Sequence, residues 1–172
     1  MVEQPFANTR ARDVMSHNLI TASPEQSLVE VRHTLIESRI GGAPVVSQGK
    51  LIGVISRSDL IRIEELVESL DAEVNDNEEW REDQADGFQH SKPRRFEGFH
   101  QRLKQLRVKD AMRSQVVSCA PDTPVRELAD EMTRHRVHRI VVVENDRPVG
   151  IVSALDLVGL VAGSAKLDSK KH

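Results

Sequence analysis

The eight residues Gly53–Leu60 read GVISRSDL, and a second copy at Gly150–Leu157 reads GIVSALDL. The copies lie 97 positions apart (53 to 150), and the same offset relates Asp13-Val14-Met15 to Asp110-Ala111-Met112. Pro24 and Pro121, and the pairs Val45-Val46 and Val142-Val143, also match at this offset without insertion or deletion. A constant offset of this kind indicates an internal duplication in which each copy is one supersecondary unit.

Each copy ends with an apolar run, a serine and a segment whose first turn carries an aspartate. If the run is a strand and the segment a helix, Ser56 with Asp59, and Ser153 with Asp156, lie together at a helix N-terminus. The free N–H groups there favour a phosphate, and a carboxylate can accept hydrogen bonds from a ribose diol. Alternatively, the serine and aspartate only cap the helix, because both residue types are preferred there. The repetition of the pair favours the binding role.

The first copy contains recognisable start and stop signals. Leu19–Thr21 is a short β-type run, and Ser23-Pro24-Glu25-Gln26 indicates a helix start, so we expect a helix over 24–38. Strands over 43–46 and 51–55 should flank a turn at 48–50, with a second helix from Ser56. The second copy repeats this order, with elements expected over 116–118 (strand), 122–135 (helix), 139–143 and 149–152 (strands) and a last helix through Leu160.

The expected strands are continuous apolar runs, which predicts burial of both faces under helices. One unit of roughly 50 residues buries little core alone. We therefore expect an α/β fold of two tandem β-α-β-β-α repeats packed as a pseudo-two-fold pair. The predicted division is repeat one over 1–63, a charged and partly helical insertion over 64–107, repeat two over 108–163 and a flexible tail over 164–172.

Composition and charge exclude several classes of protein. The net charge of −3 gives no global basic field for nucleic acid, and the scarcity of aromatic residues disfavours a base-stacking surface. The single cysteine, Cys119, excludes an intrachain disulfide, and the histidines lack metal-ligand spacing, so no metal site is expected. The N-terminus has no apolar signal core, and no apolar stretch suits a membrane span. These features favour a soluble cytoplasmic protein without a membrane or nucleic-acid partner.

The insertion differs from both repeats. It carries eleven acidic residues over 64–86 against one arginine, and then a mainly basic stretch over 92–109. One interpretation extends the preceding helix past Leu70, followed by a mobile stretch over 71–93 and a helix from Arg95. The other is a docking arm for a protein partner, with Trp80 as its anchor. The KPRR segment at 92–95 could contact nucleic acid, but the adjacent acidic run disfavours this.

Taken together, the motifs resemble the CBS domains, named after cystathionine β-synthase. The resemblance is carried by the DxM openings, by IGGAPVV at 40–46, by VHRIVVV at 137–143 and by the two serine-aspartate endings. It covers nearly all of the chain outside the insertion. It implies a CBS pair, or Bateman module, with two clefts for adenosyl ligands such as AMP, ADP, ATP or S-adenosylmethionine, and with ribose roles for Asp59 and Asp156.

The resemblance also implies that the two clefts differ. Repeat two resembles the last repeat of the AMP-activated protein kinase gamma subunit, in which a His-Arg pair at the place of His138-Arg139 reaches nucleotide phosphates. Repeat one has Gly41-Gly42 there, although Arg57 could compensate. The expected ligand contacts, with the Ser153–Asp156 cleft favoured, are Ser56, Arg57, Ser58, Asp59, Ser153, Asp156, His138 and Arg139, with Ile40 and Val137 flanking the base.

Two functions follow from these features. The first is a non-catalytic regulatory module that binds an adenosine nucleotide, with S-adenosylmethionine and NAD as other candidate ligands, forms a homodimer through its repeat helices and signals energy or metabolite state to a partner. The second is a structural interaction scaffold with degenerate clefts. An enzymatic role is not expected, because spacing reveals no general acid and base pair and Cys119 has no neighbouring base. No cofactor is required.

Overall fold

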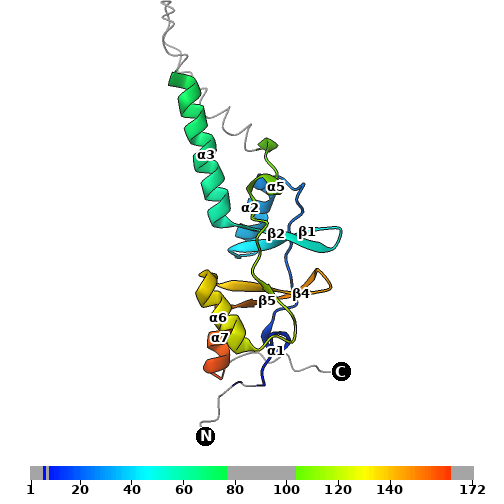
Figure 1. The fold of residues 1–172 in the computed structure, drawn as a ribbon. Coiled ribbons are helices and arrows are strands. Elements are labelled where there is room, and N and C mark those ends of the chain that lie inside the picture. The colour runs from blue at the N-terminus through cyan, green and yellow to red at the C-terminus, as the bar shows by residue number, and fades with distance from the viewer. Residues whose placement is uncertain (1–5, 7, 77–103, 164–172) are drawn as a thin grey trace, which may run out of the picture. The chain divides into compact units, whose positions relative to one another are not determined.

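The computed structural model describes residue 6, residues 8–76 and residues 104–163 (Figure 1). The first repeat contains α1 (Ala11–Val14), α2 (Leu28–Glu37), β1 (Gly42–Ser47), β2 (Lys50–Ser56) and α3 (Arg57–Asp76). The second contains α5 (Val108–Ala111), β3 (Ser118–Cys119), α6 (Val125–His135), β4 (Arg139–Glu144), β5 (Arg147–Ser153) and α7 (Ala154–Val161). The shared order of helix, helix, hairpin and helix confirms the predicted duplication and the mixed α/β class.

The described chain divides into two compact units whose bounds cross those of the repeats. The first unit comprises Met1–Thr21, Pro44–Val54 and Arg113–His172. It contains the sheet with strand order β3-β4-β5, in which β3 is parallel and β5 antiparallel to β4. Helices α6 and α7 pack on this sheet (Figure 1). Three consecutive residues of β4, Ile140 to Val142, are buried, as expected for a strand covered on both faces.

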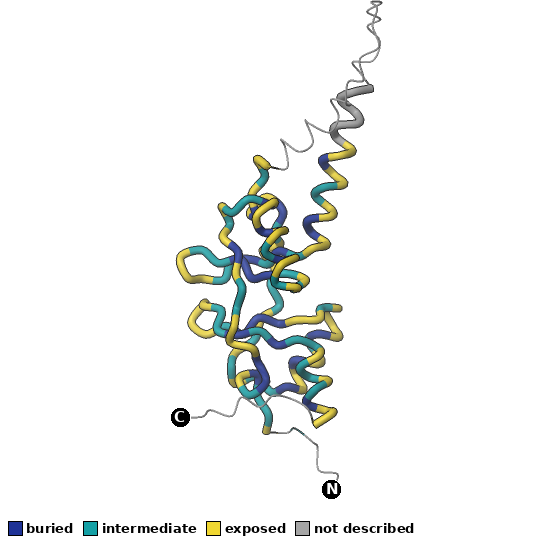
Figure 2. Tube along the Cα trace, turned by 180° about the vertical axis from the view of Figure 1, so that it is seen from behind, coloured by how far each residue is buried: buried dark blue, intermediate teal, exposed yellow. Residues whose placement is uncertain are grey.

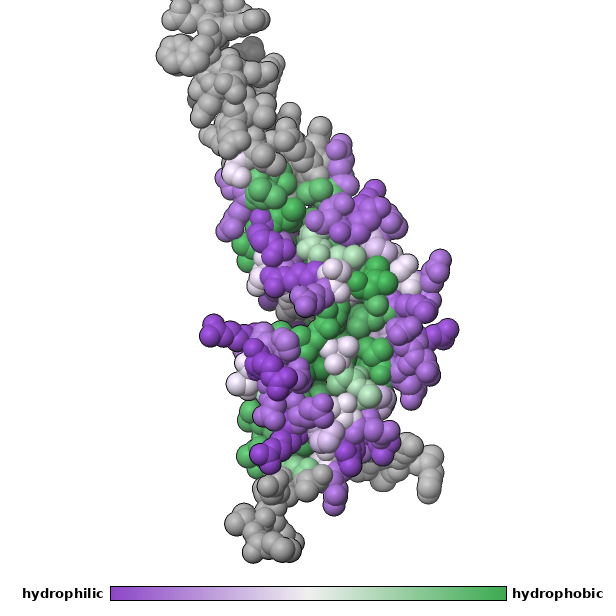
Figure 3. All heavy atoms as spheres, viewed as in Figure 1, coloured by the Kyte–Doolittle hydropathy of each residue, from purple (hydrophilic) through white to green (hydrophobic). Residues whose placement is uncertain are grey.

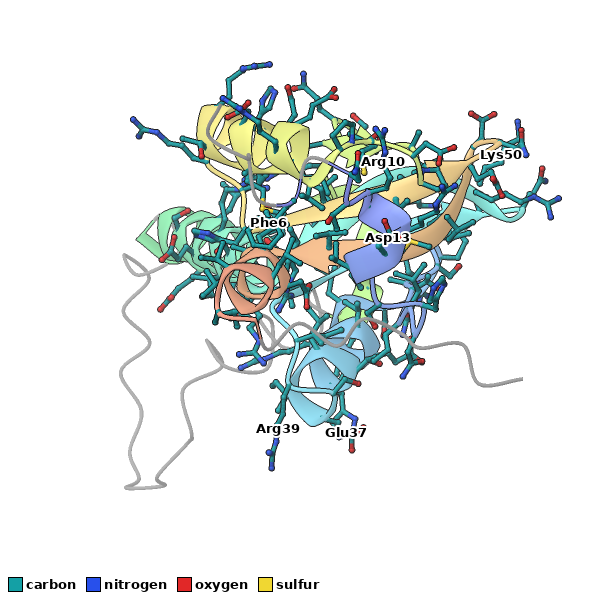
Figure 4. All side chains as sticks on the ribbon, turned by 90° about the horizontal axis from the view of Figure 1, so that it is seen from below. Phe6, Arg10, Asp13, Glu37, Arg39 and Lys50 are labelled. Carbon is teal, nitrogen blue, oxygen red and sulfur yellow. The ribbon has the colours of Figure 1, made fainter. Side chains whose placement is uncertain are left out.

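Helix α1 belongs to this first unit although its sequence opens repeat one. Ala11 and Val14 of α1, with Met15 directly after the helix, join the buried cluster that also contains Leu128 and Ile140. Asp13 Oδ2 accepts a hydrogen bond of 2.8 Å from the Arg10 N–H and so caps this short helix; both residues are labelled in Figure 4. The DxM motif of repeat one therefore contributes its apolar side chains to the core of repeat two.

Gly150 allows the chain to pass close to Met15. A Cβ at position 150 would lie 2.4 Å from the Met15 Sδ atom, which is far inside van der Waals contact. Ser16 pairs with Ile151 through two backbone hydrogen bonds of 2.9 and 3.0 Å. Only glycine fits this approach without displacing the methionine, which explains why a glycine begins the repeated GIVSALDL segment.

The tips of the two hairpins also meet within the first unit. The Leu51 N–H donates a 2.9 Å hydrogen bond to the Asp146 carbonyl, and Lys50 Nζ lies 3.1 Å from Asp146 Oδ2. Lys50 is labelled in Figure 4, and both tips are exposed in Figure 2. Because this ion pair is exposed, it contributes little to stability, and the backbone bond sets the register.

The second unit comprises Ala22–Ala43 and Ile55–Met112. Within it, α3 contacts α2 and α5. Leu28, Val31 and Leu35 share one face of α2 and are buried, whereas the neighbouring Ile36 is exposed. An exposed ion pair of 3.0 Å joins Arg32 of α2 to Glu64 of α3.

The first helix begins later than predicted. We expected a start at Ser23-Pro24, but α2 begins at Leu28, with Ser27 as its N-cap. Ser27 Oγ accepts a hydrogen bond from the Glu30 N–H, and Glu30 accepts one of 2.9 Å from the Ser27 N–H. The Ser27 hydroxyl also donates a 2.7 Å hydrogen bond to Glu30 Oε2, and this bond, together with the one from the Ser27 N–H, lowers the pKa of Glu30. Ser27 and Glu30 form a complete capping box with a carboxylate, which Ser23 and Gln26 lack, and this explains the shift of four residues.

Most other predicted helices and strands differ from the observed ones by fewer residues. The strand predicted at Leu19–Thr21 is the exception. The predicted strand there is wrong, because these three residues have no regular structure. Strand β3 is Ser118–Cys119 rather than 116–118, and α6 begins at Val125 rather than at 122, after Pro124 at its N-cap. Helix α3 extends to Asp76, which confirms the predicted extension past Leu70. Trp80, the KPRR segment, the helix expected from Arg95 and the tail over 164–172 lie outside the described residues.

Within the part of the chain that the structure describes, none of the helices combines the length and the apolar character needed to cross a membrane.

Candidate functional site

The Ser153–Asp156 corner joins β5 to α7. Asp156 Oδ2 accepts a hydrogen bond of 2.7 Å from the Ser153 N–H and another of 2.6 Å from the Ser153 hydroxyl. In return, the Asp156 N–H donates to Ser153 Oγ at 3.2 Å. This reciprocal pattern is a capping box, so the capping role considered from the sequence is present. It uses Oδ2 alone, and among the described residues Asp156 Oδ1 has no hydrogen bond or ion pair.

The Ser56–Asp59 corner between β2 and α3 repeats this geometry. Asp59 Oδ2 lies 3.0 Å from the Ser56 N–H and 2.5 Å from the Ser56 hydroxyl, and the Asp59 N–H lies 3.3 Å from Ser56 Oγ. Ser58, in the first turn of α3, is exposed. The predicted pairing of serine and aspartate at a helix start is therefore found in both repeats.

The two corners differ in what surrounds their second carboxylate oxygen. Asp59 is only 1% exposed and is the one polar residue in the buried set of the described chain. Its Oδ1 lies 3.1 Å from Arg62 Nη2, one turn further along α3. Asp156 is half-buried, and position 159, which corresponds to Arg62, is a glycine. A buried carboxylate requires a charged partner, and Arg62 was not recognised from the sequence as having this role.

The segment that precedes β4 lies beside the second corner. The Ala154 N–H donates a 2.9 Å hydrogen bond to the His138 carbonyl, and Arg139 is the register partner of Ser153. The side chains of His138 and Arg139 are exposed. The structure thus brings His138, Arg139, Ser153 and Asp156 to one edge of the sheet, where α7 begins.

The first corner has a related backbone connection but a different cation. The Arg57 N–H donates to the Gly41 carbonyl at 3.0 Å, which matches the bond between Ala154 and His138. The guanidinium group of Arg57 turns toward α2, where it donates a 3.2 Å hydrogen bond to the Leu35 carbonyl. A Cβ on Gly42 would lie 2.8 Å from the Ile55 carbonyl oxygen, so this position cannot hold a cation like Arg139 without moving the backbone.

The remaining predicted contacts are apolar, and each follows the last turn of a helix. Ile40 is half-buried, and its N–H donates to the Leu35 carbonyl at 3.0 Å. Val137 is half-buried against the apolar cluster of the first unit, and its N–H donates to the Met132 carbonyl at 3.0 Å. The structure therefore gives the two residues equivalent places in their repeats.

Cys119 is not suited to nucleophilic chemistry. Burial raises the pKa of its thiol to about 11, opposed by a hydrogen bond from Thr123, so the thiol is protonated at neutral pH. The described residues also contain no group of three or more His, Cys, Asp or Glu side chains that could hold a metal ion.

The CBS-domain family model matches residues 11–65 and 108–163, and the chain belongs to the CBS-domain family as a CBS pair. The crystal structure of the CBS domain of a CBS domain-containing membrane protein from Sphaerobacter thermophilus is 32% identical, covers 90% of this chain and 89% of that chain, and has a TM-score of 0.64.

Two further solved structures share the fold and contain ligands. The CBS domain pair of protein MJ0100, in complex with 5-methylthioadenosine and S-adenosyl-L-methionine, is 24% identical, with a TM-score of 0.61 over 90% of this chain and 97% of that chain. CBSX2 in complex with AMP is 19% identical, with a TM-score of 0.63 over 90% of this chain and 96% of that chain. At these identities the likeness shows the fold alone.

The chain spans less than half the length of several curated relatives that it matches, although it covers 88% of the uncharacterized protein MJ1426 of Methanocaldococcus jannaschii. It covers 40% of the uncharacterized protein MJ1232 of Methanocaldococcus jannaschii, with 26% identity over 91% of this chain. It covers 25% of the inosine-5'-monophosphate dehydrogenase of Korarchaeum cryptofilum, and the two sequences are 25% identical over 91% of this chain. The CBS pair is therefore a segment that occurs within larger proteins of different kinds.

Proposed function

We propose that this CBS pair binds an adenosine nucleotide at the Ser153–Asp156 corner and acts as a non-catalytic regulatory module. Occupancy of the site changes the state of the module, and a partner protein responds to that change. AMP, ADP and ATP are the leading candidates, with S-adenosylmethionine and NAD as alternatives that share the adenosyl group.

One observation carries the proposal: among the described residues Asp156 Oδ1 has no partner, and Asp156 lies at the same edge of the sheet as the exposed His138 and Arg139. Asp156 Oδ1 can accept hydrogen bonds from a ribose diol, while Oδ2 is held by Ser153. The exposed His138 and Arg139 can reach phosphate oxygens from the same edge of the sheet. A sugar and a phosphate are the two polar parts that all adenosine nucleotides share.

The ligands of structurally similar proteins support the adenosyl class. The solved CBS pairs named above contain 5-methylthioadenosine, S-adenosyl-L-methionine or AMP. All of these molecules carry an adenine and a ribose diol, whereas only AMP carries a phosphate. His138 and Arg139 therefore favour the phosphorylated member of this group for the present chain.

Regulation requires that the ligand bind two arrangements of the module with different affinities. A ligand that binds one arrangement of the module more tightly shifts the population toward that arrangement. A tenfold difference in affinity between two arrangements corresponds to about 1.4 kcal/mol, a common size for allosteric coupling. We propose that the charged insertion at 64–107 contacts the protein partner. We also propose that the module acts in the cytoplasm, where adenosine nucleotides are free in solution.

Thermal unfolding in the presence of AMP, ATP, NAD and S-adenosylmethionine tests the proposed function. A ligand at about 100 times its Kd stabilises the folded state by about 2.7 kcal/mol, which raises the Tm by several degrees. We expect AMP or ATP to produce this shift. No shift with any of the four compounds at millimolar concentration would instead support the interaction scaffold.

We further propose a homodimer through the repeat helices. Three residues at intervals of three on α7 are largely exposed: Leu155 (79%), Val158 (61%) and Val161 (74%). Figure 3 shows the hydrophobic colour over this helix. A row of large apolar side chains on a helix of eight residues is costly in water and suits a second copy of the same helix.

Val158→Asp tests this dimer. We expect the wild type to sediment as a dimer and the variant, which places a charge at the centre of the apolar row, as a monomer. Val29→Asp is the control, because Val29 is also exposed but lies on α2. A wild-type protein that remains monomeric at high micromolar concentration would contradict the proposed interface.

A further inference from the structure

We propose that Arg62 excludes the nucleotide from the Ser56–Asp59 corner, so that each chain binds one nucleotide, at Asp156. This inference rests on the proposed function and adds the residue that makes two nearly identical corners unequal. The difference lies at a single pair of equivalent positions, 62 and 159, which hold arginine and glycine.

The hydrogen bonds of the two aspartates show what remains for a ligand. Oδ2 accepts from the serine N–H and hydroxyl in both corners, with all four distances between 2.5 and 3.0 Å. A diol must therefore reach Oδ1. In repeat one, Oδ1 lies 3.1 Å from Arg62 Nη2, whereas in repeat two no described side chain occupies the equivalent place.

Burial reinforces this difference. The Asp59 side chain is 2% exposed, whereas the Arg62 side chain that pairs with it is 57% exposed. The arginine thus neutralises the buried carboxylate and extends from it toward solvent. A diol that displaced the guanidinium group would leave the buried carboxylate with hydrogen bonds from neutral hydroxyl groups but without its cation. The nucleotide therefore binds at the corner where no such displacement is required.

Because the two corners have equivalent geometry, an arginine can be introduced in repeat two at the position that corresponds to Arg62. Position 159 follows Asp156 by three residues on α7, as position 62 follows Asp59 on α3. Gly159→Arg should therefore place a guanidinium group near Asp156 Oδ1. Gly159→Ala is the matched control, because it removes the glycine and adds no cation.

Isothermal titration with AMP measures the effect. We expect wild type to bind one AMP per chain, Gly159→Ala to bind within about twofold of wild type and Gly159→Arg to bind at least about tenfold more weakly. Equal affinities for the two variants, or tighter binding by Gly159→Arg, would overturn the inference. If wild type binds neither AMP nor ATP, the proposed function itself fails, and that result is distinct.

The converse variant tests the first corner. Arg62→Ala should increase the stoichiometry from one AMP per chain to two, because it uncovers Asp59 Oδ1. Arg62→Gln, which retains a shorter polar side chain without the charge, serves the same purpose if loss of the whole side chain prevents Arg62→Ala from folding. A stoichiometry that stays at one in a folded variant shows that Arg62 is not the excluding residue.

Discussion

Asp156→Asn is expected to weaken AMP binding by about 10- to 100-fold, with little change in stability. The substitution keeps the size of the side chain and a carbonyl oxygen for the cap, but it removes the negative charge. Hydrogen bonds to a charged group contribute about 1.5–3 kcal/mol, which corresponds to this range of affinity. Titration calorimetry gives the affinity, and thermal unfolding verifies that the variant is folded.

The matched control is Asp59→Asn, which makes the same change in the other repeat. We expect it to leave the AMP affinity within about threefold of wild type and to lower the Tm, because Asp59 is buried against Arg62. If Asp59→Asn abolished binding and Asp156→Asn did not, the nucleotide would occupy the first corner, contrary to our assignment.

Leu128→Ala is expected to reduce the free energy of unfolding by about 2–5 kcal/mol. Leu128 is fully buried in α6, in the cluster that joins α1 to the sheet of the second repeat. Its truncation leaves a cavity among side chains from both ends of the sequence. Urea unfolding followed by circular dichroism measures the loss.

Leu66→Ala makes the same chemical change at an exposed position of α3, where 52% of the residue is accessible. Its cost should be below about 1 kcal/mol, because little apolar surface is lost from the core. Equal destabilisation by the two variants would mean that the cluster around Leu128 is not the main core of its unit.

The duplication was the most predictable part of the fold. A constant offset, apolar strands and hairpin turns identified both repeats and most of their strands and helices. The start of α2 was missed because two candidate caps lie four residues apart, and only the hydrogen bonds show that Ser27 with Glu30 forms the complete box. The position of α1 in the core of the other repeat could not be predicted, because sequence periodicity does not show which core an apolar segment joins.

The candidate site was predictable as a pair of corners but not in its asymmetry. Serine and aspartate at a strand-to-helix junction indicated the geometry, and the structure places His138 and Arg139 beside the second pair. Arg62 was missed because an exposed arginine on a charged helix is common. Its role depends on the burial of Asp59, which is a property of the folded chain.

Titration of the wild-type protein with AMP and with 2′,3′-dideoxy-AMP tests the central claim most directly. The two compounds share the base and the phosphate, and they differ only in the diol that we assign to Asp156. We predict measurable binding of AMP and at least about tenfold weaker binding of the dideoxy compound, with the difference lost in Asp156→Asn. Equal binding of both compounds to wild type would contradict the assignment of the ribose to this corner.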